Sequence, residues 1–311
     1  MNISQDLQNC PGITTTIAHS LSSRNFVQSI TIDVILNGIL SISATFGNTM
    51  IIVAIMRSQN LQTPSYLLIT SLAFTDLLVG LVFHPFQIIL GTYYLQKNYK
   101  RFCRLAILHI FLLSYFGFVS LLMVTCISID RYLALTLRHR YTIIVTRKRV
   151  RSSIVSLWIF AVLLASLTLI ENSVGFLMKV AVILASVLLL VILYCYIKSF
   201  RALHLYTVQI HIQQPNPLAG NFDVARYKKT LKTMLVVLGC LLSCYLPLVC
   251  SIAGQMVFKE EPVTMFYFAA ITLMCLNSSI NPVIYLIRFG DIRNACQEML
   301  RIFIQSLRHR H

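Results

Sequence analysis

The segment FVSLLMVTCISIDRYLALTLRHRY, residues 118–141, joins an apolar run to an acid and a base. The run FVSLLMVTCI carries no charge, and Asp130 and Arg131 follow it two residues later. A charge in hydrocarbon is expensive, so this pair marks a membrane boundary, performs a function at that depth, or does both. Spacing alone favours a boundary pair whose side chains reach the lipid headgroups.

The composition supports a membrane protein. Of the 311 residues, 57% are hydrophobic and 12% are charged, whereas soluble domains carry about 25% charge. The polar start MNISQDLQNCPGITTT has no basic front and no apolar core, so we expect the first apolar segment to act as the insertion signal. The nine cysteines fit neither a metal-site spacing nor a dense disulfide framework.

Apolar runs long enough to cross a bilayer recur along the chain. A crossing helix needs about 20 mostly apolar residues. Seven stretches satisfy this length: 29–57, 64–90, 103–135, 150–170, 175–203, 228–253 and 263–287. We therefore predict an all-α membrane protein with a seven-transmembrane helix bundle. Its parts are an N-terminal segment (1–28), a transmembrane domain (29–287) and a tail (288–311).

The positive charges predict the orientation. The net charge is +16, and the bases gather in the loops after spans three and five and in the tail. Such loops are typically cytoplasmic, so we expect an extracellular N-terminus and a cytoplasmic C-terminus in the plasma membrane. The expected partners of these charges are anionic lipids rather than nucleic acid. The triplet Asn2-Ile3-Ser4 is a glycosylation sequon on the predicted outer side.

Polar residues inside the spans are the candidate functional residues. We expect only two acids at depth, Asp76 and Asp130. Asp76 lies mid-span, as do Asn48 and Ser120, and Asn277 shares one helix face with a second asparagine four residues on. An oxygen-rich cavity of this kind suits a small hard cation or water. The alternative is a polar network that holds the helices together.

Two prolines and two tyrosines indicate helices that can change conformation. Pro247 and Pro282 each interrupt the hydrogen bonding of a predicted span and permit a kink, although prolines are also common in membrane helices. A kinked helix can pivot between two states. Tyr194 and Tyr285 lie near the inner ends of spans five and seven, where their hydroxyls can approach Arg131.

Taken together, these residues resemble the class A (rhodopsin-like) G-protein-coupled receptors over about residues 29–304. The matching motifs occur in the family's order, one per helix. They are GN at 47–48, LAFTD at 72–76, DRY at 130–132, the lone Trp158, CYLP at 244–247 and NPVIY at 281–285. The resemblance implies a signalling receptor, not an enzyme, whose partners are an extracellular ligand and a heterotrimeric G protein.

The resemblance also implies residue roles. The residues for G-protein coupling and activation are Asp130, Arg131, Tyr132, Tyr194, Tyr245, Pro247, Asn281, Pro282 and Tyr285. The residues of a sodium pocket are Asp76, Ser120, Asn277 and Asn281, and no other cofactor is expected. The tail resembles the family's short amphipathic helix, which lies under the membrane after span seven. Cys296 on this helix is a candidate palmitoylation site.

Departures from the family pattern are informative. The usual cysteine slot in span three holds Ala106, and the loop after span four has no cysteine, so the usual disulfide is absent. Cys10 and Cys103 are a possible replacement pair. Tyr245 and Ser186 stand where most relatives have tryptophan and proline, and no acid precedes span six to restrain Arg131 at rest. These features are similar to the melanocortin, adenosine, lysophospholipid and cannabinoid group and suggest basal activity.

The predicted ligand pocket lies between the outer halves of spans three, five, six and seven. Its residues are His109, Leu113, Ser114, Tyr245, Val249, Ile252, Phe268 and Thr272. Span three has no outer acid for an amine and span seven has no lysine for retinal, so we expect a small neutral or lipid-like ligand. A peptide- or nucleoside-binding receptor and a constitutively active or orphan receptor are alternatives. An ion-coupled transporter is a remote one, because no internal repeat is visible.

Overall fold

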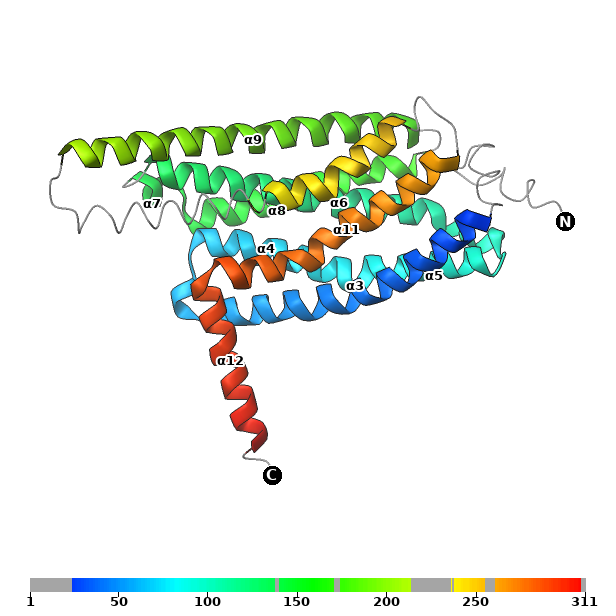
Figure 1. The fold of residues 1–311 in the computed structure, drawn as a ribbon, viewed down its shortest axis with the longest axis horizontal. Helices are drawn as coiled ribbons and strands as arrows, with labels where there is room; N and C mark the ends of the chain where they lie inside the picture. Colours follow the sequence, from blue (N-terminus) through cyan, green and yellow to red (C-terminus); the bar gives the residue numbers. More distant parts are fainter. Residues whose placement is uncertain are drawn as a thin grey trace.

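The computed structural model describes residues 24–137, 140–170, 174–213, 236, 238–254 and 261–308. In these parts, apolar helices run side by side along the long axis of the molecule (Figure 1). Six are long and apolar enough to cross a membrane, and the Leu238–Gly254 helix is a shorter apolar one within the predicted sixth span. The predicted all-α seven-helix bundle is confirmed.

The helix bounds follow the predicted spans with extensions at the ends. The spans are α3 (Arg24–Arg57), α4–η2–α5 (Pro64–Leu95), α6 (Tyr99–Leu137), α8 (Arg147–Ser166), α9 (Val174–Gln213), Leu238–Gly254 and α11 (Glu261–Arg288). Short helical segments lie in the connections: η1 (Gln59–Leu61), α7 (Tyr141–Ile144) and η4 (Leu167–Leu169). Helices continue beyond their apolar runs because backbone hydrogen bonding does not end where hydrophobicity does; α9 reaches Gln213, past the predicted end at 203.

Threonine side chains cap two of the helices on the predicted cytoplasmic side. The Thr63 side chain accepts a hydrogen bond from the Tyr66 amide, and Pro64 occupies the first turn of α4 (Pro64–Leu78). The Thr146 side chain accepts from the Arg149 amide at the start of α8. Each cap satisfies an amide that the first helical turn leaves free, so both helix starts are encoded locally.

The second span changes its winding halfway. Between α4 and α5 (His84–Leu95), residues Val79–Phe83 of η2 form a π-helical turn. Pro85 lacks an amide hydrogen, and a wide turn before it accommodates the missing bond. Gly80 in this turn packs so tightly that a Cβ atom would lie 2.8 Å from the Thr45 backbone nitrogen of α3. An extra residue in a turn rotates the following side chains by roughly 100°, which reorients His84 and the residues after it.

The most buried helices of the bundle are the second span, α6 and α11. In the most apolar window of α11, 67% of residues are buried, against 11% in α9, so α9 is mainly a lipid-facing helix. Gly47 permits a close approach of α3 and α11, because a Cβ there would lie 3.0 Å from the Pro282 ring. The GN motif of span one is thus placed against the NPVIY motif of span seven.

The helix after span seven is α12 (Gly290–Arg308), which leaves the end of the bundle crosswise (Figure 1). Its Ile292 and Cys296 side chains are buried, whereas Ile302 is exposed. The predicted amphipathic helix is therefore present. Burial raises the pKa of the Cys296 thiol, and palmitoylation at this position stays a prediction.

Candidate functional site

A hydrogen-bonded triad surrounds the Asp130 carboxylate at the end of α6. The Ser65 hydroxyl of α4 donates to Asp130 Oδ2 at 2.7 Å, and the Tyr141 hydroxyl of α7 donates to Oδ1 at 2.6 Å. Burial, and then the bond to Asp130, raise the pKa of Tyr141 to about 12, so its hydroxyl remains a donor at physiological pH. Ser65 and Tyr141 were not among the predicted site residues, although Tyr141 lies only ten residues after Arg131 in the sequence.

Arg131 lies beside this triad with part of its surface exposed. Its Nε is 4.0 Å from Asp130 Oδ2, and its guanidinium lies 5.8 Å from the centre of the Phe289 ring. Phe289 also contacts buried Tyr285 of α11, with ring centres 6.2 Å apart. Tyr132, the third residue of the motif, is half-buried. Phe289, between α11 and α12, thus lies against Arg131, and it was not among the predicted site residues.

Tyr194 does not reach this cluster. Its side chain is 55% exposed and carries Lys198 above the ring at 5.5 Å. The predicted approach of Tyr194 to Arg131 is therefore absent from this conformation. The reason is the lipid-facing position of α9, which turns Tyr194 outward.

A second buried carboxylate, Asp76, lies at mid-depth and is fully buried. The Asn281 side-chain amide donates to Asp76 Oδ2 at 2.7 Å. Asn48 links α3 to α11 by donating to the Ser278 carbonyl at 3.0 Å. Three oxygens in this region, Asp76 Oδ1, Asn48 Oδ1 and Ser120 Oγ, have no hydrogen-bond partner among the described residues, and neither does Asn277 Nδ2. Carboxylate, amide and hydroxyl oxygens are the kinds of ligand that hard cations bind.

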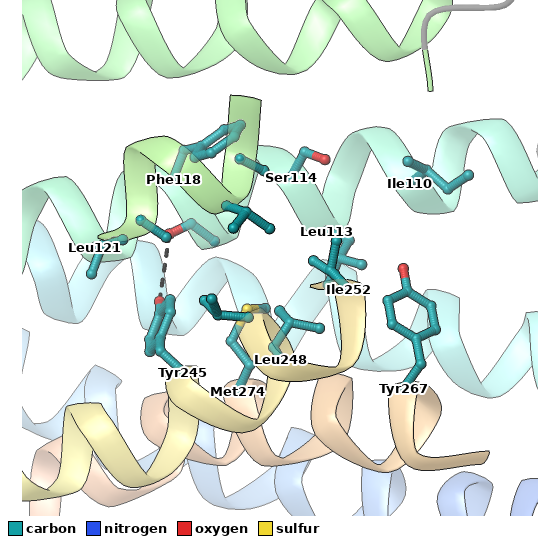
Figure 2. Close-up of a pocket in the computed structure, with 15 residues that line it drawn as sticks. Ile110, Leu113, Ser114, Phe118, Leu121, Tyr245, Leu248, Ile252, Tyr267 and Met274 are labelled. Atoms are coloured by element: carbon teal, nitrogen blue, oxygen red, sulfur yellow. Dashed lines mark hydrogen bonds between the residues drawn. The ribbon is translucent and has the colours of Figure 1, made fainter. Parts of the chain in front are cut away.

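A cavity of about 740 Å³ lies between α6, α9, the Leu238–Gly254 helix and α11. Figure 2 shows Tyr245 toward one end of it and Tyr267 toward the other. Tyr245 donates to the Gly117 carbonyl at 3.5 Å. Five predicted pocket residues line the cavity: Leu113, Ser114, Tyr245, Val249 and Ile252. Ile110 of α6 also lines the cavity, and further lining residues were not predicted, among them Phe118, Ala181, Ala185, Tyr267 and Met274. The lining is mostly apolar, with a serine and two tyrosine hydroxyls.

Three predicted pocket residues lie elsewhere. His109 is buried against the second span, with its ring 5.5 Å from that of Phe83. Phe268 packs edge-on against Phe26 of α3 at 5.3 Å. Thr272 faces α3, where its hydroxyl donates to Asp33. The α11 face that carries Phe268 and Thr272 is turned toward α3, so the pocket prediction for these residues is corrected.

Asp33 is a third acid at membrane depth, and the expectation of only two was wrong. It is 7% exposed and accepts hydrogen bonds from Asn37, Gln87 and Thr272. A signal was present in the sequence, because Asp33 and Asn37 are four residues apart in one predicted span. We name the set Asp33, Asn37, His84, Gln87 and Thr272 the outer polar cluster.

The remaining predicted residues are placed as follows. Pro247 lies within the Leu238–Gly254 helix and Pro282 within α11. Cys103 is disulfide-bonded. The proposed partner Cys10, the sequon at Asn2 and the segment after α9 lie outside the described residues.

Comparisons with known proteins agree with this arrangement. The sequence model of the family described as "7 transmembrane receptor (rhodopsin family)" matches residues 47–175 and 169–285. The rat (Rattus norvegicus) cannabinoid receptor 2 is 25% identical, over 84% of this chain and 76% of the relative. The alpha-1A adrenergic receptor of Oryzias latipes is 24% identical, over 94% and 71%. The rat melanocortin receptor 3 is 24% identical, over 84% and 83%.

Proposed function

Because the chain belongs to the rhodopsin family of seven-transmembrane receptors, we propose that it couples an extracellular ligand to a heterotrimeric G protein through Arg131. The observation that carries this assignment is the environment of Arg131. Its partner carboxylate is fixed from α4 and α7, while its guanidinium rests on Phe289 and keeps an exposed fraction of 20%. An arginine held by an aromatic ring and a shared carboxylate can be released by a helix movement.

The orientation follows from the charges. We place the Arg131 end of the bundle and α12 in the cytoplasm and the N-terminus outside the plasma membrane, with glycosylation at Asn2. A disulfide from Cys103 to Cys10 would tie the N-terminal segment to the outer end of α6. The bonded state of Cys103 supports this pairing.

For the ligand, we favour a small neutral or lipid-like molecule in the 740 Å³ cavity. Its wall offers three hydroxyls, those of Ser114, Tyr245 and Tyr267, within an otherwise apolar surface. Such a site binds apolar bodies and orients them by few hydrogen bonds. The relatives are named for cannabinoids, adrenergic ligands and melanocortins; the apolar lining supports the first kind of ligand best.

Asp76 is the proposed sodium site. The carboxylate with Asn48 Oδ1 and Ser120 Oγ would hold the ion, and Asn281 would orient the carboxylate through its 2.7 Å bond. The buried Asn277 would contribute its side-chain amide to the same site. Bound sodium would supply a positive charge at mid-depth and hold α3, the second span and α6 together. Ligand-driven movement of α11 would then compete with the ion, by a shift between two populations.

The coupling role is tested by changing Arg131 to alanine. We expect G-protein activation in cells, including basal activation, to fall at least about tenfold, with surface expression unchanged. The exposed Arg147 at the start of α8 provides a matched control, and Arg147→Ala should signal as the wild type does. The measurement is nucleotide exchange across a panel of G proteins, without ligand and with lipid, nucleoside and peptide libraries. Full signalling by the Arg131 variant would refute the assigned role.

A further inference from the structure

The outer polar cluster joins three helices around one carboxylate. Asn37 Nδ2 donates to Asp33 Oδ1 at 3.0 Å, Gln87 Nε2 donates to Oδ2 at 3.0 Å, and the Thr272 hydroxyl donates to Oδ1. These donors come from α3, α5 and α11. Asp33 is therefore the point at which the half of α11 that precedes the NPVIY motif is attached to its neighbours.

The local sequence explains this convergence. Asp33 and Asn37 are one helical turn apart on α3, and His84 and Gln87 are one turn apart on α5. The π-helical turn before His84 rotates both α5 residues, and Gly80 within that turn lets α3 approach closely. His84 Nδ1 lies 2.7 Å from Asn37 Oδ1. Since the Asn37 amide nitrogen donates to Asp33, its oxygen accepts, and His84 donates from Nδ1 as a neutral ring.

The carboxylate has no cationic partner among the described residues. No lysine or arginine there lies within ion-pair distance of Asp33, and the nearby ring of Tyr93 carries Arg101 at 5.5 Å instead. Titratable side chains on the elements packed around Asp33 include His84, Tyr93 and Tyr94 of α5, His109 of α6 and Cys275 of α11. All of these are neutral in their ordinary states near pH 7. A buried charge without a partner is costly, so the cluster favours uptake of a positive charge.

A proton is the charge that the geometry accommodates. Phe26 packs against Tyr94 at 5.5 Å and against Phe268 at 5.3 Å, and this aromatic layer leaves Asp33 only 7% exposed. Water can reach such a group, but a larger ligand cannot. A carboxylate has about four lone-pair directions, and the three donors of Asp33 occupy only three of them. One direction is therefore left for an added proton, which displaces none of the neighbouring side chains.

The hydrogen bonds can also rearrange around a protonated Asp33. Thr272 Oγ1 lies 3.4 Å from the Phe268 carbonyl, so its hydroxyl can donate there while accepting the proton of Asp33. Gln87 Oε1 is buried and has no partner among the described residues, so the amide can turn and serve as a second acceptor. The Asp33 carboxyl group thus has hydrogen-bond partners in both of its protonation states.

We propose that Asp33 is a proton-binding site whose occupation fastens the outer half of α11 to α3 and α5. The proton is bound more tightly when the cluster is closed and dry than when α11 moves away and water hydrates the carboxylate. By linkage, acid then favours the fastened state and alkaline conditions favour its release. The site is separate from Asp76, and its occupant is a proton rather than a metal ion.

The first test uses the purified full-length chain in detergent, with thermal unfolding recorded from pH 5 to pH 8. The measured quantity is the Tm of the wild type minus the Tm of Asp33→Asn. This difference should fall by roughly 3 °C or more between pH 5 and pH 8, because the folded wild type loses a bound proton. Asp33→Ser replaces Asp33→Asn if the latter is not recovered. Two controls should keep the wild-type pH curve: Asp291→Asn, the same change at an exposed acid of α12, and His109→Gln, a buried histidine outside the cluster.

The outcomes separate the proposal from its rivals. A constant Tm difference between wild type and the Asp33 variants overturns the proton site, as does a pH dependence that disappears in His109→Gln. Replacing sodium by choline at fixed pH should leave the Asp33-dependent difference unchanged; a sodium-dependent difference would make the occupant a metal ion and overturn the proposal.

The second test rests on the proposed receptor function. Basal G-protein activation in cells should fall about twofold or more when the outer medium is acidified from pH 8 to pH 6. Asp33→Asn should give the low value at both pH values. A pH response that survives in Asp33→Asn contradicts the proposal. If no variant signals under any condition, the receptor assignment fails, and the unfolding test alone decides the proton site.

Discussion

Two buried carboxylates of the same bundle are held in opposite ways. Asp76, fully buried at mid-depth, receives a 2.7 Å side-chain hydrogen bond from Asn281, while its Oδ1, Asn48 Oδ1 and Ser120 Oγ have no partner in the described structure. Asp33, 7% exposed in the outer half, receives three, from Asn37, Gln87 and Thr272. A carboxylate with free oxygens around it is suited to an ion, whereas one surrounded by donors needs at most a proton.

The largest effect should come from removing the Asn281 donor of Asp76. Asn281→Ala deprives a fully buried carboxylate of its 2.7 Å hydrogen bond, which costs about 3 kcal/mol, whereas Thr272→Val leaves Asp33 two donors and costs about 1 kcal/mol. Thermal unfolding of the two purified variants, with the wild type as reference, measures the difference. Equal losses would mean that the number of donors does not distinguish the two sites.

An intermediate effect is expected from sodium. Sodium in excess of its dissociation constant should raise the Tm of the wild type by a few degrees, because it binds only the folded state. Asp76→Asn should abolish this increase and Asp33→Asn should keep it. The measurement is unfolding in sodium chloride against choline chloride at constant ionic strength. An Asp76→Asn variant that keeps the full increase would remove the ion from this site.

The two carboxylates also differ in how well the sequence predicted them. Asp76 was identified from its mid-span position and from NPVIY, and its bond to Asn281 connects those two motifs. Asp33 was overlooked because it lies near the start of an apolar run, where an acid is easily assigned to a boundary. Its depth depends on α3 beginning at Arg24 and on the rotation imposed by the π-helical turn, and neither follows from hydrophobic periodicity.

The same limit applied to the ligand cavity. The pocket implied by the family resemblance included Leu113, Ser114 and Val249, which line the cavity because α6 and the Leu238–Gly254 helix turn one face toward it. It failed for Thr272, since the direction in which an all-round apolar helix such as α11 faces is set by its neighbours. Tyr194 on α9 is 55% exposed in this conformation, and its role in activation stays a prediction. Motif order predicted the fold, whereas helix rotation needed the packed structure.

The smallest effect is predicted at the third carboxylate, Asp130, which has two hydroxyl donors and also lies beside a cation, with Arg131 Nε 4.0 Å from its Oδ2. Tyr141→Phe removes one donor and keeps the ring, and Ser65 still donates at 2.7 Å, so we expect a loss of about 1 kcal/mol or less. Because the pKa of Tyr141 is raised to about 12, the hydroxyl stays protonated below pH 9.

The loss in Tyr141→Phe should therefore be the same at pH 6 and pH 8, in contrast to the Asp33 variants. A raised pKa of this kind favours folding at all pH values below the ordinary tyrosine range, and the contribution is lost only above it. Unfolding at both pH values, with basal signalling as a second measurement, tests this. A pH-dependent loss would mean that Asp130 itself takes up a proton, and the contrast between an ion site, a proton site and a hydroxyl-bound carboxylate would no longer hold.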